Sequence, residues 1–146
     1  PIVNPKDIRK IIQISKKNND FVCNGYAKVI NNKSSLSKNI PKLALDKNKN
    51  LLYMSRSEIP SSFRTKNKYF LKQICIYSFP RKILQKVFRN NSKSNFESFE
   101  DIEILRFLEA GYKVKMIKLS GKSMSVDVPD DIKKVEAILK KNEKSS

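Results

Sequence analysis

The chain has 146 residues, of which 39% are hydrophobic and 31% are charged, enough for one folded domain with its own core. The chain has no histidine, only three glycines and two widely spaced cysteines. These counts exclude histidine-based catalysis, a glycine-rich phosphate loop and a disulfide scaffold. No apolar run approaches the roughly 20 residues of a membrane span, and we expect a cytoplasmic protein. The net charge of +17 is compatible with a nucleic-acid partner, but lysines spread along the chain and only six arginines favour a compositional bias.

The N-terminal region predicts a helix followed by a strand. Asn4 is a favourable N-cap and Pro5 suits the first helical position, so we expect a helix to begin there. The side chains expected on its inner face are Ile8, Ile11, Ile12 and Ser15. Residues 21–30 are apolar and β-branched enough for a strand, in which Gly25 marks a bulge or a close approach of another segment.

Residues 42–79 predict an antiparallel unit. Two apolar runs, 42–46 and 51–56, flank an asparagine-rich turn, which is typical of a hairpin. A polar loop then leads to a long strand over residues 69–79. This strand is rich in apolar and aromatic residues, and we expect it to be an exposed sheet edge, which invites pairing with another strand unless it is covered.

The second half predicts three helices and two strands. They are a helix beginning at Pro80, a helix over 96–110, strands over 114–119 and 124–128, and a helix beginning at Pro129. The inward side chains expected on the helices are Ile83, Leu84, Val87, Phe88, Phe99, Ile102, Leu105, Leu108, Ile132, Val135, Ile138 and Leu139. Gly111 is placed to end the second helix, and residues 140–146 are expected to form a frayed tail. The alternation of helices and strands predicts a layered α/β fold, with residues 42–79 as an antiparallel extension.

Two acidic clusters stand out against the basic background. The first comprises Glu97, Glu100, Asp101 and Glu103. These carboxylates either complement a helix dipole or, for Glu100 and Glu103, contact a substrate. In the second cluster, Asp127 ends a strand directly before a helix, a position where ligands bind in open α/β sheets, and its carboxylate could hold Mg²⁺. The alternative is that Asp127 serves only to begin the helix.

Other candidate site residues lie on the predicted antiparallel unit. Arg56 ends a strand nearly opposite Lys42, and its fork suits bidentate binding of a substrate carboxylate, unless it is an ordinary surface arginine. Gln73 and Tyr77 share one face of their strand with Cys75. We expect Cys75 to be a small core residue, because no histidine is available to activate it as a nucleophile.

Four stretches together resemble a known family. They read Asn-Ile-Pro-Lys-Leu-Ala-Leu-Asp at 39–46, Leu-Tyr-Met-Ser-Arg-Ser-Glu-Ile-Pro at 52–60, Gln-Ile-Cys-Ile-Tyr at 73–77 and Asp-Val-Pro-Asp-Asp at 127–131. Their order and spacing resemble the C-terminal half of the 3-deoxy-manno-octulosonate cytidylyltransferase (CMP-Kdo synthetase) family. Pro1 resembles the last residue of the family's Gly-Asp-Glu-Pro motif, so we expect residues 1–146 to be the C-terminal portion of a single cytidylyltransferase domain.

The resemblance implies a fold and an activity. It implies part of a three-layer, Rossmann-like nucleotide-diphospho-sugar transferase fold, paired as a homodimer through residues 42–79. The implied enzyme transfers CMP from CTP to a 2-keto-3-deoxy sugar acid (Kdo), with Mg²⁺ and release of pyrophosphate, for lipopolysaccharide synthesis. Asp127 matches the family's metal ligand. The residues that match regions lining the sugar site are Arg56, Gln73, Tyr77, Glu100 and Glu103.

The sequence also departs from the family. The family more often has His in place of Gln73, often Gln in place of Ile104 and Thr in place of Val128. The first two changes are expected near the sugar, so a nonulosonic acid remains an alternative substrate, and a basic nucleic-acid-binding module remains an alternative of another class. The family's N-terminal CTP-binding half is not recognisable, so we expect the isolated chain to be inactive.

Overall fold

The computed structural model describes residues 2–17, 20–31, 37–89, 92–124, 126 and 129–143. Its helices are α1 (Pro5–Lys16), α2 (Arg81–Val87), α3 (Asn95–Glu100), α4 (Ile104–Glu109) and α5 (Pro129–Glu143). Its strands are β1 (Val22–Ile30), β2 (Lys42–Leu45), β3 (Leu51–Ser55), β4 (Tyr69–Ser78) and β5 (Val114–Lys118). The strands form one mixed sheet in the order β3-β2-β4-β1-β5, in which β1 runs parallel to β5 and antiparallel to β4.

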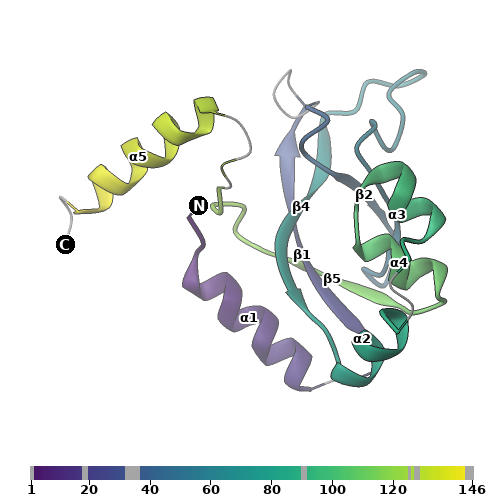
Figure 1. The fold of residues 1–146 in the computed structure, drawn as a ribbon. Coiled ribbons are helices and arrows are strands. Elements are labelled where there is room, and N and C mark those ends of the chain that lie inside the picture. Colours follow the sequence, from purple (N-terminus) through teal and green to yellow (C-terminus); the bar gives the residue numbers. More distant parts are fainter. Residues whose placement is uncertain are drawn as a thin grey trace.

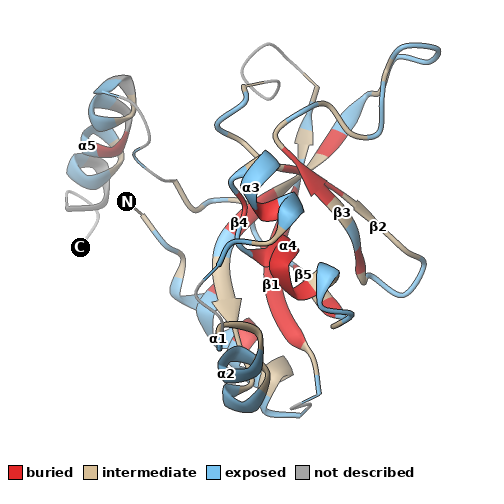
Figure 2. Ribbon diagram, turned by 45° about the vertical axis from the view of Figure 1, so that its right-hand side comes forward, coloured by how far each residue is buried: buried red, intermediate tan, exposed pale blue. Residues whose placement is uncertain are grey.

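Helices cover both faces of the sheet and give the expected three layers (Figure 1). On the face covered by α1, the buried core consists of Ile11, Cys23, Ala27, Ile74, Ile117 and Leu119. On the face covered by α4, it consists of Val22, Tyr26, Leu43, Leu51, Met54, Ile102, Ile104, Leu105, Phe107, Val114 and Met116. Successive side chains of β1 enter the two cores alternately, as a strand buried on both sides requires, and burial concentrates around this strand and α4 (Figure 2).

Helix α1 begins with the predicted asparagine N-cap, but it buries a different face. Ile11 is buried, whereas Ile8 and Ile12, which we expected to face the core, are 40% and 45% exposed. One turn before Ile11 the buried residue is Asp7, whose carboxylate accepts hydrogen bonds from the amide (3.0 Å) and the hydroxyl (2.6 Å) of Ser120. These bonds to the loop after β5 favour the observed rotation of the helix.

The predicted irregularity at Gly25 is confirmed, both as a bulge and as a close approach. Asn24 lies opposite Tyr77 of β4, but the next residue, Gly25, lies opposite Ile74, so the extra length of β4 bulges at this point. A Cβ atom at position 25 would overlap the Leu119 side chain and lie 3.1 Å from the Ile74 carbonyl oxygen. Glycine is therefore the residue that fits here.

Gly25→Ala should lower the free energy of unfolding by about 1–3 kcal/mol, because the new methyl group overpacks the contact with Leu119. Gly111→Ala is a useful comparison. Nothing lies within 4 Å of a Cβ atom there, so the cost comes from its φ of 79° alone and should be about 1 kcal/mol. Urea unfolding measures both values, and an unchanged midpoint for Gly25→Ala would contradict the steric argument.

The predicted hairpin is present, but it folds back over the sheet and does not extend from it. Its side chains in the core are Leu43, Leu51 and Met54. Its turn reaches β5, where the Met116 amide donates to the Lys49 carbonyl at 2.9 Å. In the sheet, β4 lies between β2 and β1. The expectation that the strand over residues 69–79 is an exposed edge is therefore wrong at Lys72, where β2 pairs with β4, but among the described residues no strand pairs with residues 74–77 on that side.

The prediction of one helix over residues 96–110 is also wrong. The structure has two helices, α3 and α4, separated at Asp101, which adopts a left-handed backbone conformation (φ 51°, ψ 50°). Phe99, which we expected to face the core, is 83% exposed as a result. Gly111 ends α4 as predicted, with a positive φ and the two hydrogen bonds of a Schellman motif.

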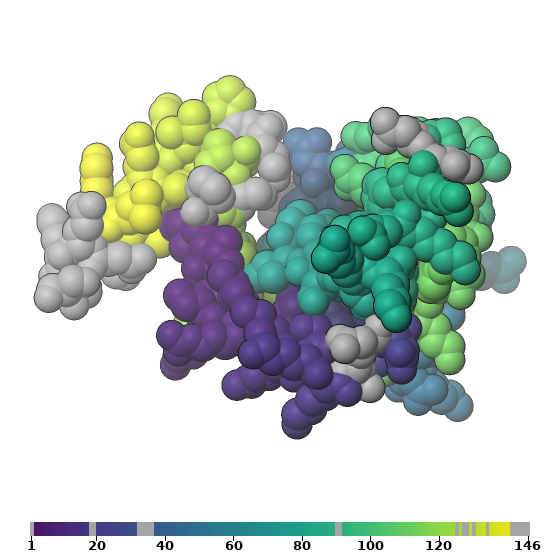
Figure 3. Space-filling view, turned by 60° about the horizontal axis from the view of Figure 1, so that its bottom comes forward, coloured from purple at the N-terminus to yellow at the C-terminus, as the bar shows by residue number. Residues whose placement is uncertain are grey.

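Helix α5 differs most from its prediction. It stands apart from the sheet, beside the N-terminal end of α1 (Figures 1 and 3). Val135 is buried as expected, but Ile132 and Leu139 are each 48% exposed because no sheet face covers them. The helix continues to Glu143, so residues 140–143 are not the frayed tail that we expected.

The strand predicted over residues 124–128 is represented, in the described part of that range, by a single antiparallel bridge between Met124 and Ile2. This bridge brings the start of the chain beside the segment that follows β5. Among the described residues, no helix is both long enough and apolar enough to cross a membrane.

Candidate functional site

An open cleft of about 670 Å³ lies beside the edge of β4. Its walls are residues 72–77 of β4, residues 39–41 before β2, Arg56 after β3, and residues 101–103 between α3 and α4. The lining is completed by Ile2, Val3, Ser123, Met124 and Val126. Segments far apart in the sequence meet around one cavity, which is the arrangement expected of a small-ligand site.

The cleft is open because β2 separates from β4 after a short contact. The two strands pair at Lys42 and Lys72, and the Gln73 amide donates to the Pro41 carbonyl at 3.0 Å. Beyond Gln73, no strand of the described chain lies on that side of β4. Residues 74–77 consequently line the cleft.

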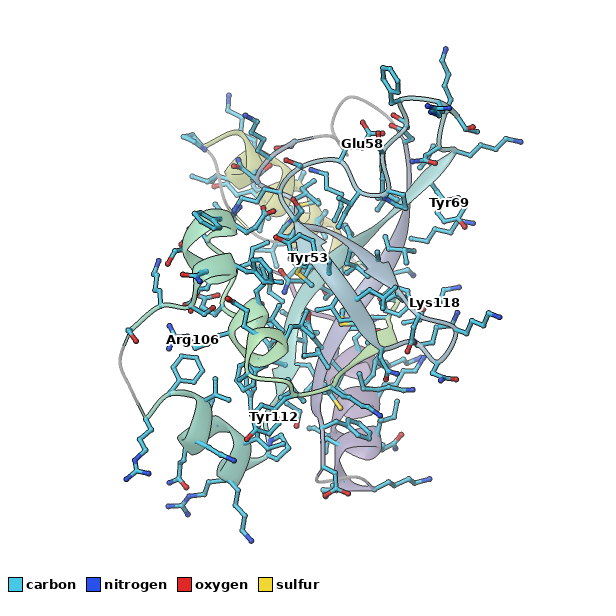
Figure 4. All side chains as sticks on the ribbon, turned by 90° about the vertical axis from the view of Figure 1, so that its right-hand side faces the viewer. Tyr53, Glu58, Tyr69, Arg106, Tyr112 and Lys118 are labelled. Atoms are coloured by element: carbon cyan, nitrogen blue, oxygen red, sulfur yellow. The ribbon has the colours of Figure 1, made fainter. Side chains whose placement is uncertain are left out.

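The cleft collects most of the residues that the sequence predicted for a substrate site. Four of them line it: Arg56, Gln73, Tyr77 and Glu103. Glu100 is not brought to it, because its carboxylate accepts hydrogen bonds from the Tyr53 hydroxyl (3.4 Å) and the Arg56 amide (2.9 Å) and so joins α3 to β3. Tyr53 is labelled on β3 in Figure 4. Asp127 lies outside the described residues.

Arg56 forms part of the cleft wall and also holds the neighbouring segments together. Its guanidinium donates to the carbonyl oxygens of Lys38, Glu100 and Asp101, at 3.2, 2.7 and 2.9 Å. Its Nη2 atom also lies 3.7 Å from the Asp101 carboxylate. A guanidinium has five N–H groups, so about two remain for a ligand after these three hydrogen bonds.

Lys42 is a buried lysine behind this wall. Its ammonium group donates to the carbonyl oxygens of Ser37 (2.7 Å) and Arg56 (2.9 Å), which confirms that Lys42 and Arg56 lie nearly opposite each other. Burial lowers the pKa of Lys42, and the nearby Glu58 carboxylate opposes that shift. The two hydrogen bonds fix the segment before β2 against the end of β3.

A buried chain of side-chain hydrogen bonds crosses the bulge in β4. The Asn24 side-chain amide donates to the carbonyl oxygens of Ile74 (3.1 Å) and Ile76 (3.0 Å). The Gln73 amide donates to Asn24 Oδ1 (3.1 Å) and to the Tyr77 hydroxyl (2.9 Å). The sequence analysis missed Asn24. Its signal was an asparagine inside an otherwise apolar strand, since a buried amide needs partners for its polar atoms.

The bulge also changes the position of Cys75, which is exposed and lines the cleft. The prediction that Cys75 is a core residue is therefore wrong. The buried cysteine is Cys23, and burial raises the pKa of its thiol. Burial also raises the pKa of Tyr77 well above the usual tyrosine range, and Coulombic interactions with Cys75 and Glu103 add to the shift. The Tyr77 hydroxyl therefore stays protonated.

The cleft carries charges of both signs. Arg56 and Lys72 contribute positive charge, and Asp101 and Glu103 contribute carboxylates. The Asp101 carboxylate is paired with Lys93 at 3.1 Å as well as with Arg56. Within the described part of the chain, Glu103 has no ion-pair partner. Ile104, which the resemblance placed near the sugar, is instead buried in the core and does not line the cleft.

Comparison with known proteins identifies the family. The model of the family described as cytidylyltransferase matches residues 1–124, which include every residue that lines the cleft except Val126. The chain belongs to the cytidylyltransferase family. Within this family it is 30% identical, over 141 residues, to a 3-deoxy-manno-octulosonate cytidylyltransferase of Nitratiruptor sp., covering 94% of this chain and 58% of the relative. It is 32% identical, over 138 residues, to an 8-amino-3,8-dideoxy-manno-octulosonate cytidylyltransferase of Shewanella baltica, covering 93% and 56%.

A solved structure shares the fold. A CMP:2-keto-3-deoxy-manno-octonic acid synthetase complexed with CTP superimposes with a TM-score of 0.85 and 24% identity, covering 97% of this chain and 58% of that one. The predicted α/β fold is thereby confirmed. The chain spans somewhat over half the length of these proteins, and its expected place in the C-terminal portion of a cytidylyltransferase stays a prediction.

Mg²⁺ is the metal that the family resemblance implies. Among the described residues, no group of three or more histidine, cysteine, aspartate or glutamate side chains could hold a metal ion. Mg²⁺ is usually held by one or two carboxylates together with substrate phosphates and water. Val126 lines the cleft, and Asp127, the candidate ligand from the sequence, follows it directly in the chain but lies outside the described residues.

Proposed function

We propose that the chain provides the sugar-acid site of a cytidylyltransferase, with residues 1–146 forming part of a single domain. The enzyme joins CMP from CTP to a 2-keto-3-deoxy sugar acid, such as 3-deoxy-manno-octulosonate for lipopolysaccharide synthesis, and releases pyrophosphate. The observation that carries the proposal is that Arg56, Gln73, Tyr77 and Glu103, from separate parts of the sequence, line one cleft. The names of the relatives support a sugar acid of this class.

The cleft suits a polyhydroxylated acid. Arg56 and Lys72 supply positive charge for a carboxylate, and Arg56 has N–H groups to spare. Gln73 and Tyr77 supply hydrogen-bonding groups for hydroxyls. The Glu103 carboxylate can accept from a sugar hydroxyl or from the 8-ammonium group of the amino sugar acid named for the Shewanella relative. We therefore propose the sugar acid and its 8-amino form as the two candidate substrates.

The proposed reaction is a phosphoryl transfer. The anomeric hydroxyl oxygen of the sugar forms a bond to the α-phosphorus of CTP, the bond from that phosphorus to the pyrophosphate oxygen breaks, and the hydroxyl proton is released. Mg²⁺ held by Asp127 would supply neutralisation of the phosphate charge. The cleft residues bind and orient the sugar, which fixes the attacking oxygen and lowers the entropic part of the barrier.

Pyrophosphate release by an active protein that contains this chain tests the proposal. With CTP and Mg²⁺ present, release should require 3-deoxy-manno-octulosonate or its 8-amino analogue, and the ratio of the two kcat/KM values identifies the substrate. A nonulosonic acid is the third substrate to compare. Release that does not depend on any sugar acid would contradict the proposal. So would a salt-sensitive nucleic-acid gel shift without any sugar-dependent release.

We also propose a homodimer formed through residues 42–79. The edge strand of this unit is β3, where Leu52 is 60% exposed, and Phe63 and Tyr69 of the same unit are exposed too. Sedimentation at micromolar concentration should show a dimer, and Leu52→Lys should shift it toward the monomer. The matched Leu84→Lys, on the surface of α2, should leave the dimer intact. A monomeric parent protein would contradict the proposal.

A further inference from the structure

The orientation of the Asn24 side chain is fixed by the backbone. One end of this fully buried amide lies 3.1 Å from the Ile74 carbonyl oxygen and 3.0 Å from the Ile76 carbonyl oxygen. Carbonyl oxygens accept hydrogen bonds and cannot donate them. The end of Asn24 that faces them must be the NH₂ group, and Oδ1 must face Gln73.

Asn24 in turn fixes the orientation of Gln73. The Gln73 atom that lies 3.1 Å from Asn24 Oδ1 must be a donor, so it is Nε2. The same nitrogen lies 2.9 Å from the Tyr77 hydroxyl oxygen. Both N–H groups of Gln73 are used in this way, the Tyr77 oxygen acts as the acceptor, and Oε1 is the polar atom of Gln73 that remains.

We infer that Asn24 is a positioning residue that sets which hydrogen bonds this edge of the cleft can make. Through Asn24, Gln73 presents a carbonyl oxygen as an acceptor, while Tyr77 keeps a hydroxyl proton to donate. On the proposed function, Gln73 therefore accepts from a sugar hydroxyl and cannot bind the sugar carboxylate. The carboxylate is left to the cations of the cleft, Arg56 and Lys72.

The surroundings of the chain of hydrogen bonds agree with this assignment. Tyr77 is held in its protonated form by burial, which raises its pKa, so its hydroxyl is a donor throughout the physiological range. Cys75 lies within hydrogen-bonding reach of that hydroxyl on the cleft side. Asn24 and Gln73 do not titrate, so the donors and acceptors that these two side chains provide do not change with pH.

The first test uses the 146-residue chain without ligand. Nuclear magnetic resonance should show slow solvent exchange for the side-chain NH₂ protons of both Asn24 and Gln73, by at least about tenfold relative to Gln85, which is exposed on α2. Gln73→Met and Gln85→Met assign the two glutamine signals. Fast exchange of the Gln73 protons would mean that its NH₂ group faces the cleft, and would overturn the inference whether or not the chain binds a sugar.

The second test is a double-mutant cycle on the affinity for 3-deoxy-manno-octulosonate. Gln73→Met should weaken binding about tenfold, and Asn24→Ala should weaken it by a similar factor although Asn24 does not line the cleft. The double variant should bind no more weakly than Gln73→Met alone, because Asn24 acts through Gln73. Gln85→Met should bind like the parent.

The inference would be overturned if the double variant bound the sugar acid more weakly than Gln73→Met alone, by the product of the two single-variant factors. Asn24→Ser, which keeps one donor for the backbone carbonyls, replaces Asn24→Ala in the cycle if the alanine variant does not fold. Asn24→Ser should also weaken binding, since the serine side chain is too short for its hydroxyl to reach Gln73. A parent chain that binds no sugar acid, but shows slow exchange at Gln73, would count against the proposed function and still support the role of Asn24.

Discussion

Replacing Arg106 with methionine should lower the free energy of unfolding by about 3–5 kcal/mol. Arg106 and Glu97 form a buried, bidentate ion pair, with Nε–Oε2 and Nη2–Oε1 distances of 2.5 and 2.7 Å. Without the guanidinium, the Glu97 carboxylate would be buried with no counter-charge, and the desolvation cost would no longer be offset. Urea unfolding followed by circular dichroism measures the loss.

The pair has this effect because it joins several segments. The Glu97 carboxylate also accepts from the Ser94 amide at 3.2 Å, at the start of α3. The Arg106 guanidinium stacks on the ring of Phe88, which follows α2, at 4.2 Å from its centroid. Arg106 lies on α4, where Figure 4 labels it. The contact therefore ties α3 and α4 to the end of α2.

Two further variants separate the loss of a pair from the loss of an arginine. Arg81→Met, at an exposed position of α2, should change the free energy of unfolding by less than about 0.5 kcal/mol. The double variant Glu97→Leu/Arg106→Met should regain most of the loss, because apolar side chains of similar volume replace a buried pair at little cost. A loss below about 1 kcal/mol for Arg106→Met would contradict the argument.

The same pair predicts a pH dependence. Hydrogen bonds from Arg106 lower the pKa of Glu97, against the opposing effect of burial. A lowered folded-state pKa gives stability that is present above the unfolded value, about 4.3, and is lost as the pH falls through the folded value. The parent chain should therefore lose stability below about pH 4.3 more steeply than the Glu97→Leu/Arg106→Met variant.

Most elements were predictable because their signals are local. β1, the hairpin, β4 and β5 lie where apolar patterns and turn residues place them, and α1 begins at its asparagine cap. The neighbours of β4 were not predictable in the same way. The hairpin folds back because its turn bonds to β5, between Lys49 and Met116, and nothing within residues 42–56 specifies that contact.

The break between α3 and α4 shows the same limit at a smaller scale. Helical periodicity continues through residues 96–110, so local reasoning predicts one helix. In the structure, Arg56 donates to the carbonyl oxygens of Glu100 and Asp101, which would otherwise be lone acceptors at the end of α3. A residue that directly follows β3 thus stabilises the end of the helix, and Asp101 tolerates the left-handed conformation there.

The site was predictable in its residue types but not in its supporting contacts. Arg56, Gln73 and Tyr77 were found as polar groups in or at the end of apolar strands, Glu103 was found in an acidic cluster, and all four matched a family-like pattern. Asn24 was missed because its importance depends on the bulge in β4, which becomes visible only when the register of two strands is known. The exposure of Cys75 has the same origin.

Asp127→Asn should lower kcat about 10²–10³-fold in an active cytidylyltransferase that contains this chain, because a neutral amide binds Mg²⁺ weakly and no longer helps to stabilise the transferring phosphoryl group. Asp127 lies outside the described residues, and it directly follows Val126, which lines the cleft, in the sequence. Asp131→Asn is the matched control from the same acidic run, already within α5, and should keep kcat within about threefold. Thermal unfolding should show both variants folded, and raising the Mg²⁺ concentration should partly restore the Asp127→Asn variant. A kcat near that of the parent, with an unchanged Mg²⁺ dependence, would mean that Asp127 serves only to begin α5.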